Sequence, residues 1–226
     1  MQINQSVLYG LDNQHFVDCL SHRLERQTAA AFLLMQQAAK ADNIDLQICS
    51  AFRDFDRQQF IWNNKVNGKR PVLNRDSVAV DITLLTPNEL IEHILIWSAI
   101  PGMSRHHWGT DIDIFDGNMI TKQDLQLISA EYQQGGPCYK LSRWLDKHAQ
   151  EFGFYLPFQA GLSGVSPEAW HLSYYPVADK YTQSFDSTAL KRVLASSSVN
   201  LKEYILPQLD ALIAEYVYRV APSPAS

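Results

Sequence analysis

The segment "SRHHWGTDIDIFD", residues 104–116, gathers imidazole and carboxylate side chains around a single glycine. Its possible metal ligands are His106, His107, Asp111, Asp113 and Asp116. Zinc enzymes usually bind the ion through three such side chains and leave one position open for water. Acids that alternate with isoleucine are also typical of an edge strand with one solvated face. The segment alone leaves both interpretations open.

The segment "SPEAWHLSYY", residues 166–175, places Glu168 three residues before His171. In a metal site the histidine would bind the ion. The carboxylate, too far back to share the coordination, would reach a water molecule as a general base. The alternative is a solvated loop acid followed by a hydrogen-bonded core histidine. The E-x-x-H spacing is common, so it does not decide between the two.

The third segment is "CSAFRDFDRQQF", residues 49–60, in which Arg53 directly follows an apolar run. A guanidinium group binds a carboxylate through two parallel hydrogen bonds, so Arg53 is a candidate for holding an acidic substrate group. The alternative is a local ion pair with Asp54 or Asp56.

Together the three segments have the order and spacing of one family. The chain resembles the VanY-like D-alanyl-D-alanine carboxypeptidases, which are zinc peptidases with the motifs S-G-Y-R-S-x-x-x-Q, S-x-H-x-x-G-x-A-x-D and E-x-W-H. The resemblance covers about residues 25–180. The matching residues are Ser50, Arg53, Gln58, Ser104, His106, Gly109, Asp113, Glu168, Trp170 and His171.

The resemblance implies a zinc ion, Zn(2+), as cofactor, bound by His106, Asp113 and His171. It implies that Glu168 is the catalytic base and that Arg53 helps to hold the substrate. It also implies three further substrate-pocket residues, Gln58, Ser104 and Trp170.

Three residues near the motifs need separate mention. His107 matches no functional position of the family, which predicts a place beside the site or on the surface. Asp54 stands where the family has serine, and Asp111 where it has alanine. Both substitutions add negative charge near the expected site, so we expect them to affect which peptide ends are preferred.

The expected activity is removal of a C-terminal D-amino acid from a small peptide or peptidoglycan-derived substrate. Two alternatives share the zinc site: an L,D-carboxypeptidase and a peptidoglycan endopeptidase. A third is a zinc-stabilised binding module without turnover. Glu168 argues against the module, because a purely structural metal site needs no general base.

Composition limits the other classes of function. The chain has 226 residues, 46% of them hydrophobic and 19% charged, which fits one domain, residues 1–226, with a sizeable core. The net charge of -5, without basic clusters, argues against nucleic acid as a partner. Three scattered cysteines predict neither disulfides nor a thiolate zinc site.

Targeting signals are not evident. The apolar runs are too short to span a bilayer, so no transmembrane segment is expected. The first residues lack a cationic stretch followed by an apolar one, so no secretion signal is predicted. On sequence alone this favours the cytoplasm, whereas the family's usual substrate lies outside it. The compartment and the oligomeric state therefore stay open.

These residues must be positioned by an α+β fold, because helical and strand patterns do not alternate regularly. We expect a small antiparallel sheet flanked by helices, and the resemblance implies the D-Ala-D-Ala metallopeptidase or hedgehog-like fold. The spacing predicts strands over 46–52, 112–115, 154–158 and 168–176. It predicts helices over 22–41, 54–65, 86–98, 139–152 and, as a C-terminal extension broken near Pro207, 187–220. Residues 78–85 are expected to form a strand or an ordered loop, and the extension a lid, a packing element or a dimer surface.

Overall fold

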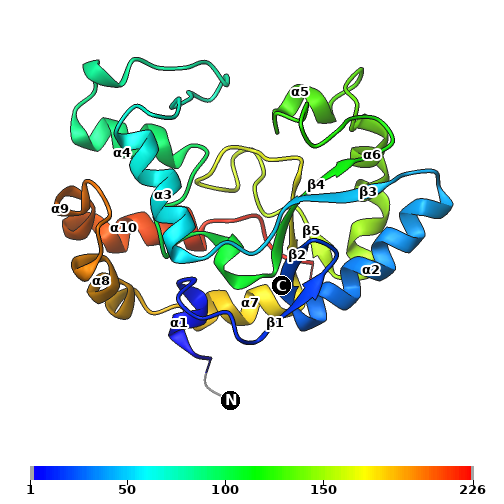
Figure 1. The fold of residues 1–226 in the computed structure, drawn as a ribbon, viewed down its shortest axis with the longest axis horizontal. Helices are drawn as coiled ribbons and strands as arrows, with labels where there is room; N and C mark the ends of the chain where they lie inside the picture. The colour runs from blue at the N-terminus through cyan, green and yellow to red at the C-terminus, as the bar shows by residue number, and fades with distance from the viewer. Residues whose placement is uncertain (1–2, 225–226) are drawn as a thin grey trace.

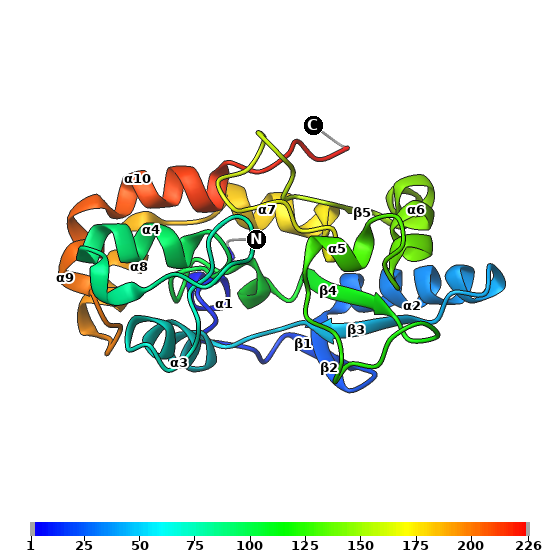
Figure 2. The ribbon, with the colours of Figure 1, turned by 90° about the horizontal axis from the view of Figure 1, so that it is seen from above.

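The computed structural model describes residues 3–224. It has a sheet half and a helical half, which lie side by side in both ribbon views (Figures 1 and 2). The sheet is antiparallel throughout, in the order β3-β4-β6-β5. Its strands are β3 (Leu46–Ser50), β4 (Asp111–Asp116), β6 (His171–Tyr174) and β5 (Phe154–Tyr155). The expected α+β fold with a small antiparallel sheet is confirmed.

Alternation along β4 assigns the two faces of the sheet. Ile112 and Ile114 are fully buried on one face, where they pack with Leu172 of β6 and with helices α2 (Arg26–Ala41) and α6 (Tyr139–His148). Asp111 and Asp113 therefore project from the opposite face. All six residues of β4 are buried, because the strand lies between β3 and β6 and is not at an edge.

The first predicted helix begins later than expected. Residues His22–Glu25 form strand β2, which pairs with β1 (Phe16–Cys19), and α2 begins at Arg26. The Glu25 side chain caps the helix by accepting a hydrogen bond from the Thr28 backbone N–H. Leu24 is buried, as the helical pattern predicted, but it reaches the core from the strand.

The helical half gathers both ends of the described chain around one core. Its helices are α1 (Gln5–Leu8), α3 (Phe55–Val66), α4 (Pro87–Leu95), α7 (Tyr175–Gln183), α8 (Ser187–Ser196), α9 (Lys202–Ile205) and α10 (Leu209–Ile213), followed by a π-helical turn, Ala214–Tyr218. Leu190, Leu194 and Val217 of the C-terminal extension are fully buried in the same core as Trp62 and Trp108. The extension is thus a packing element.

The predicted helix over 187–220 is interrupted. Helix α8 ends at Ser196, and the chain re-enters helix only after Leu201, which has a positive φ of 64°. Pro207 lies in a 3₁₀ turn, Leu206–Gln208, as expected for a residue without a backbone N–H. The break lets the extension fold back on α3, where Trp62 donates a hydrogen bond to the Asn200 carbonyl.

Several other boundaries differ from the predictions. Helix α4 has the expected capping box of Thr86 and Glu89 but ends at Leu95. The predicted strand 168–176 ends at Tyr174, where α7 begins with Pro176 in its first turn, and the strand expected over 154–158 is only Phe154–Tyr155. Residues 78–85 form an isolated bridge to Leu73 and a 3₁₀ turn, Ile82–Leu84.

Two expectations from composition can be compared with the structure. The three cysteines are free, and Cys49 is only partly buried. Within residues 3–224, every helix is too short or too polar to cross a lipid bilayer.

Candidate active site

Strand register brings two of the proposed metal ligands together. Asp113 of β4 is paired with His171 of β6 on one side and with Ser50 of β3 on the other. Directly opposed side chains of antiparallel strands lie on the same face with Cβ atoms about 4.5–5.5 Å apart. The three side chains therefore form a row across the polar face of the sheet.

The third proposed ligand comes from the turn that leads into β4. His106 lies in a 3₁₀ turn, Arg105–Trp108, which ends at Gly109 with a φ of 65°. A Cβ atom at Gly109 would lie 2.9 Å from the Glu25 backbone nitrogen, so both the conformation and the close packing require glycine. The turn reverses the chain and places the His106 ring against Asp113.

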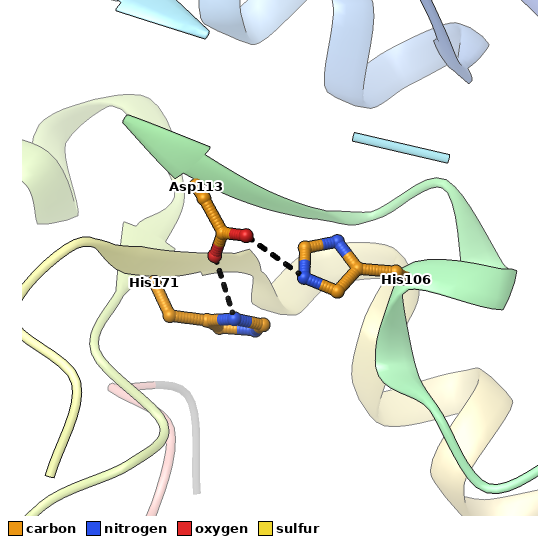
Figure 3. A group of neighbouring side chains, drawn as sticks. All are labelled: His106, Asp113 and His171. Carbon is orange, nitrogen blue, oxygen red and sulfur yellow. Dashed lines mark ion pairs between the residues drawn. The ribbon is translucent and has the colours of Figure 1, made fainter. Parts of the chain in front are cut away.

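The three side chains point toward one another (Figure 3). Asp113 Oδ2 lies 3.2 Å from His106 Nε2, and Asp113 Oδ1 lies 3.1 Å from His171 Nδ1. One ligand atom from each residue falls within 4.8 Å of the other two, and all three residues are buried. Tetrahedral zinc with bonds of 2.0–2.2 Å needs donor atoms about 3.3 Å apart, so the spacing fits this ion.

One atom of this cluster is incompletely satisfied. Asp113 Oδ1 is buried and lies 3.1 Å from His171 Nδ1, but it accepts no well-aligned hydrogen bond within the part of the chain that the structure describes. A buried carboxylate oxygen without a hydrogen bond is costly, and a bound cation would reduce that cost. The donor set and this incompletely satisfied oxygen both fit a zinc ion held by His106, Asp113 and His171.

Asp111 organises the two imidazoles from behind. Its Oδ1 accepts hydrogen bonds from His171 Nε2 at 3.0 Å and from Arg105 Nε at 2.8 Å, and its backbone carbonyl lies 3.2 Å from His106 Nδ1. These contacts direct the other nitrogen of each ring toward Asp113. Carboxylates and carbonyls commonly orient metal-binding histidines in this way.

The charge that Asp111 adds is compensated. Burial would raise the pKa of Asp111, but the Arg105 guanidinium and His171 outweigh burial and lower it to about 2. Arg105 is itself buried and also donates to Ser173 Oγ at 2.7 Å. The departure from the family pattern at this position therefore comes with a partner, which the sequence motifs did not reveal.

The protonation states suit a cation. Burial raises the pKa of Asp113, but His106 and His171 lower it well below its usual range, so the group is a carboxylate. Burial lowers the pKa of His106, which keeps that ring neutral. Burial also lowers the pKa of His171, but its hydrogen bonds to Asp111 and Asp113 prevail and raise it to about 10. A metal ion bound there would take the place of the proton on His171.

Glu168 lies beside the cluster, three residues before β6 begins. Its Oε2 is 3.5 Å from His171 Nδ1, and its backbone N–H donates to the Phe158 carbonyl. Burial raises the pKa of Glu168 to about 8, while His171, Arg53 and Lys65 oppose that rise. A carboxyl group with a pKa near neutrality can both accept and release a proton, which is the property required of a general base.

Arg53 follows β3 and is fixed by its backbone and its side chain. Its N–H donates to the His106 carbonyl at 3.1 Å, and its own carbonyl accepts from His107 Nδ1 at 2.6 Å. The guanidinium donates to Gln58 Oε1 at 2.8 Å and to Ser50 Oγ at 3.0 Å.

The local ion pair considered for Arg53 is absent from residues 3–224. Asp54 is exposed and instead caps α3 by accepting a hydrogen bond from the Arg57 backbone N–H at 2.7 Å. The Arg53 guanidinium therefore retains its charge for another partner, although burial lowers the pKa of the group.

Two neighbours hold Arg53 from behind and do not themselves line the pocket. Gln58 is fully buried and, besides accepting from Arg53, donates to the Ala99 carbonyl at 2.7 Å. His107 is also fully buried, so it is not a surface residue. Its Nε2 accepts from the Gly102 N–H, and burial lowers its pKa to about 3, which keeps the ring neutral.

These groups open into one cavity of about 410 Å³, called here the central pocket. The three candidate ligands line it, as do Arg53, Ser104, Glu168 and Trp170. Trp170 stacks on Trp97, which contributes another part of the wall. Asp116, at the far end of β4, does not line the pocket and caps a turn instead.

The pocket also contains residues that the motifs did not indicate. Lys65 and Arg70 line it from α3 and from the segment that follows, and Tyr216 reaches it from the C-terminal extension. The spacing of Gln58, Ile61 and Lys65 along a predicted helix could have indicated that Lys65 shares their face. No sequence signal pointed to Arg70 or Tyr216.

Comparison with known proteins identifies the family. The family model described as VanY, D-alanyl-D-alanine carboxypeptidase, matches residues 21–177. The chain belongs to this family. The VanY match includes all three candidate ligands, Glu168 and Arg53, and it makes the protein a peptidase of the carboxypeptidase type.

Two relatives are similar to parts of the chain. An uncharacterised protein of Haemophilus influenzae is 36% identical over 121 residues, covering 52% of this chain and 92% of that protein. A D-alanyl-D-alanine carboxypeptidase of Enterococcus faecalis is 31% identical over 141 residues, covering 61% of this chain and 42% of that protein.

Solved structures share the VanY fold. VanYB in complex with D-alanine-D-alanine superimposes with a TM-score of 0.53 and 22% identity, covering 84% of this chain and 94% of that one. A mutant of the vancomycin resistance D,D-pentapeptidase VanY in complex with Zn(II) gives a TM-score of 0.52 and 21% identity, covering 77% and 89%.

Proposed function

We propose that the protein is a zinc-dependent carboxypeptidase that removes a C-terminal D-amino acid from peptidoglycan-type peptides. The observation that carries the proposal is the arrangement of the central pocket. It holds a buried His-Asp-His cluster, the carboxyl group of Glu168 and the Arg53 guanidinium, which has no acidic partner within residues 3–224. Membership in the VanY family supports the same conclusion.

His106, Asp113 and His171 would hold the zinc ion. Bound there, zinc would supply Lewis-acid polarisation of the scissile carbonyl and would lower the pKa of a water molecule toward neutrality. Asp111 keeps both imidazoles oriented, and its pairing with Arg105 prevents it from competing as a ligand.

Glu168 would take a proton from the attacking water and transfer it to the leaving amine. Its carboxyl lies next to His171, and burial raises its pKa, which helps it to hold the proton between these two steps. The buried position of Glu168 limits exchange of that proton with solvent.

Arg53 would bind the free carboxylate of the substrate. Ser50 and Gln58 orient the guanidinium, and the nearest acidic residues in the sequence are engaged elsewhere or exposed. A pocket that clamps a terminal carboxylate favours cleavage at the chain end over cleavage within the chain. Ser104 and Trp170 would form parts of the wall around the terminal residue.

A direct test compares peptides that end in D-Ala-D-Ala, L-Lys-D-Ala and meso-diaminopimelyl-D-Ala, with and without a chelator. The proposal predicts release of the terminal D-alanine from the D-Ala-D-Ala peptide, loss of that release with chelator, and recovery with added zinc. Preference for the other two peptides would indicate an L,D-carboxypeptidase. Zinc binding without cleavage of any peptide would favour a non-catalytic module.

A further inference from the structure

The central pocket contains two cations that the proposed mechanism does not use. Lys65 lies near the end of α3 and Arg70 in the segment that follows, and both line the pocket together with Arg53. Among residues 3–224, neither the Lys65 ammonium nor the Arg70 guanidinium has a hydrogen-bonding or ion-pairing partner. The chain as a whole has a net charge of -5, so this pocket is a local region of positive charge in an acidic protein.

Helix geometry locates Lys65 relative to the proposed carboxylate clamp. Gln58, which holds Arg53, and Lys65 are seven positions apart and share one face of α3 with the pocket residue Ile61. At 1.5 Å per residue, the two positions are about 10 Å apart along the helix. That distance corresponds to about three residues of extended peptide.

The segment that carries Arg70 is attached to the pocket wall. The Trp97 indole donates a hydrogen bond to the Asn74 carbonyl at 2.9 Å, and Leu73 is bridged to Ala79. Trp97 in turn stacks on Trp170, next to the candidate ligand His171. The attachment keeps Arg70 beside the pocket even though its side chain is exposed.

The electrostatic environment of Lys65 would favour a bound anion. Burial, followed by the charges of Arg70 and Arg53, lowers the pKa of Lys65 to about 8, while Glu168 only partly opposes them. Holding a positive charge at this position is therefore unfavourable in the free protein. An anionic group bound between Lys65 and Arg70 would offset that cost.

We propose that Lys65 and Arg70 form a second anion-binding subsite, which binds a carboxylate on a residue within about three positions of the substrate's C-terminus. This inference rests on the proposed function and names its substrate class: peptides with an additional free carboxylate close to the cleaved bond. A lysine at that place would be repelled by the two cations. Diaminopimelate, which carries a carboxylate at the end of its side chain, would be attracted.

Matched peptides test the subsite. Each peptide ends in D-Ala-D-Ala, and the residue before these two is meso-diaminopimelate, its side-chain amide, or L-lysine. The wild type should cleave the diaminopimelate peptide with a kcat/KM about tenfold or more above the other two, the effect of one charge-assisted hydrogen bond. In the Lys65→Gln, Arg70→Gln double variant the three values should approach one another.

Lys69 provides a matched control. It is exposed and lies next to Arg70, but it does not line the pocket, so Lys69→Gln should keep the preference of the wild type. A single variant, Lys65→Arg, retains the charge and should also keep it. Equal cleavage of the three peptides by the wild type would overturn the subsite, as would a preference that the double variant leaves unchanged.

Failure of the proposed function would look different. If no peptide is cleaved, the same three peptides can be titrated into the protein by calorimetry. The subsite still predicts a dissociation constant about tenfold lower for the diaminopimelate peptide, and loss of this difference in the double variant. Equal affinities of the wild type for all three would refute the subsite independently of turnover.

Discussion

The central pocket has two walls that differ in charge and in how completely their charges are paired. On the strand wall, from β4 and β6, the carboxylates and imidazoles are held by one another and by Arg105, and the buried Asp113 Oδ1 accepts no well-aligned hydrogen bond within residues 3–224. On the helix wall, Arg53, Lys65 and Arg70 have no acidic partner in the described chain. The first wall offers ligands for a cation, and the second offers groups that bind anions.

Opposite charges are thus kept apart within one cavity. Asp113 and Glu168 are near enough to raise the pKa of Arg53, yet neither forms an ion pair with it. A direct ion pair would satisfy both walls and block the pocket. In the proposed account, this separation leaves each wall to bind something from outside the chain: a metal ion on the strand wall and carboxylates on the helix wall.

The largest expected effect comes from the strand wall. Glu168→Gln should reduce turnover of a D-Ala-D-Ala peptide by about 10²–10⁴-fold, because general-base catalysis contributes that much. Zinc content should stay at that of the wild type, because Glu168 is not among the three candidate ligands. Turnover and zinc content would be measured on the same samples. Parallel loss of both would make Glu168 a ligand or a structural residue.

Substitution of Arg53 tests the helix wall most directly. Arg53→Lys should lower kcat/KM on free-acid peptides by an amount that corresponds to about 2–5 kcal/mol of transition-state stabilisation. The reason is that a point charge replaces a two-point contact. Amidation of the peptide C-terminus should cost the wild type a similar amount. The two changes together should cost little more than either alone, since they remove the same contact. Kinetics of both enzymes on both peptides decide this, and equal cleavage of acid and amide by the wild type would favour an endopeptidase.

Asp111 tests how far the strand wall depends on its supporting layer. Asp111→Asn should weaken zinc binding by about 10–100-fold, because the contact that orients the His171 ring is altered. Asp116→Asn, in the same strand but outside the pocket, is the control and should leave zinc affinity unchanged. Competition with a zinc-binding dye measures both. Equal weakening in the two variants would indicate a general loss of strand structure.

The smallest expected effect concerns the charge of Lys65 on the helix wall. Lys65 faces Arg53, Arg70 and Glu168, and its pKa is lowered from 10.5 to about 8, so it loses its charge as the pH rises through that value. The preference for diaminopimelate over lysine peptides should therefore decline from about pH 6.5 to about pH 9.5. Lys65→Arg should keep its preference over this range, because arginine stays charged. A ratio of kcat/KM values that declines equally in both proteins would assign the titration to another group.

The two walls also differed in how well the sequence predicted them. The alternation in "DIDIFD" correctly predicted a strand, and the motif spacing selected His106, Asp113 and His171, which the structure brings together. The pairing of Asp113 with Ser50 and His171 is a long-range register, which no local pattern encodes. For the same reason the partnership of Asp111 with Arg105 and Ser173 could not be predicted.

The errors in the fold have local causes. Residues His22–Glu25 continue the helical spacing of α2, but Glu25 caps the helix, so they pair with β1 instead. Of the cations on the helix wall, Arg53 was predicted, whereas Lys65 and Arg70 were missed. Arg70 lies in a segment without regular periodicity, and its position depends on a backbone hydrogen bond to the Asn64 carbonyl and on the contact from Trp97 to Asn74.

The most direct test of the two-wall account is a zinc titration of metal-free protein during cleavage of a free-acid peptide that ends in D-Ala-D-Ala. The account predicts that activity rises with added zinc and reaches a plateau at one equivalent per chain, and that Asp113→Ala neither binds the equivalent nor cleaves. Cleavage by the metal-free protein, or a normal plateau in Asp113→Ala, would contradict it.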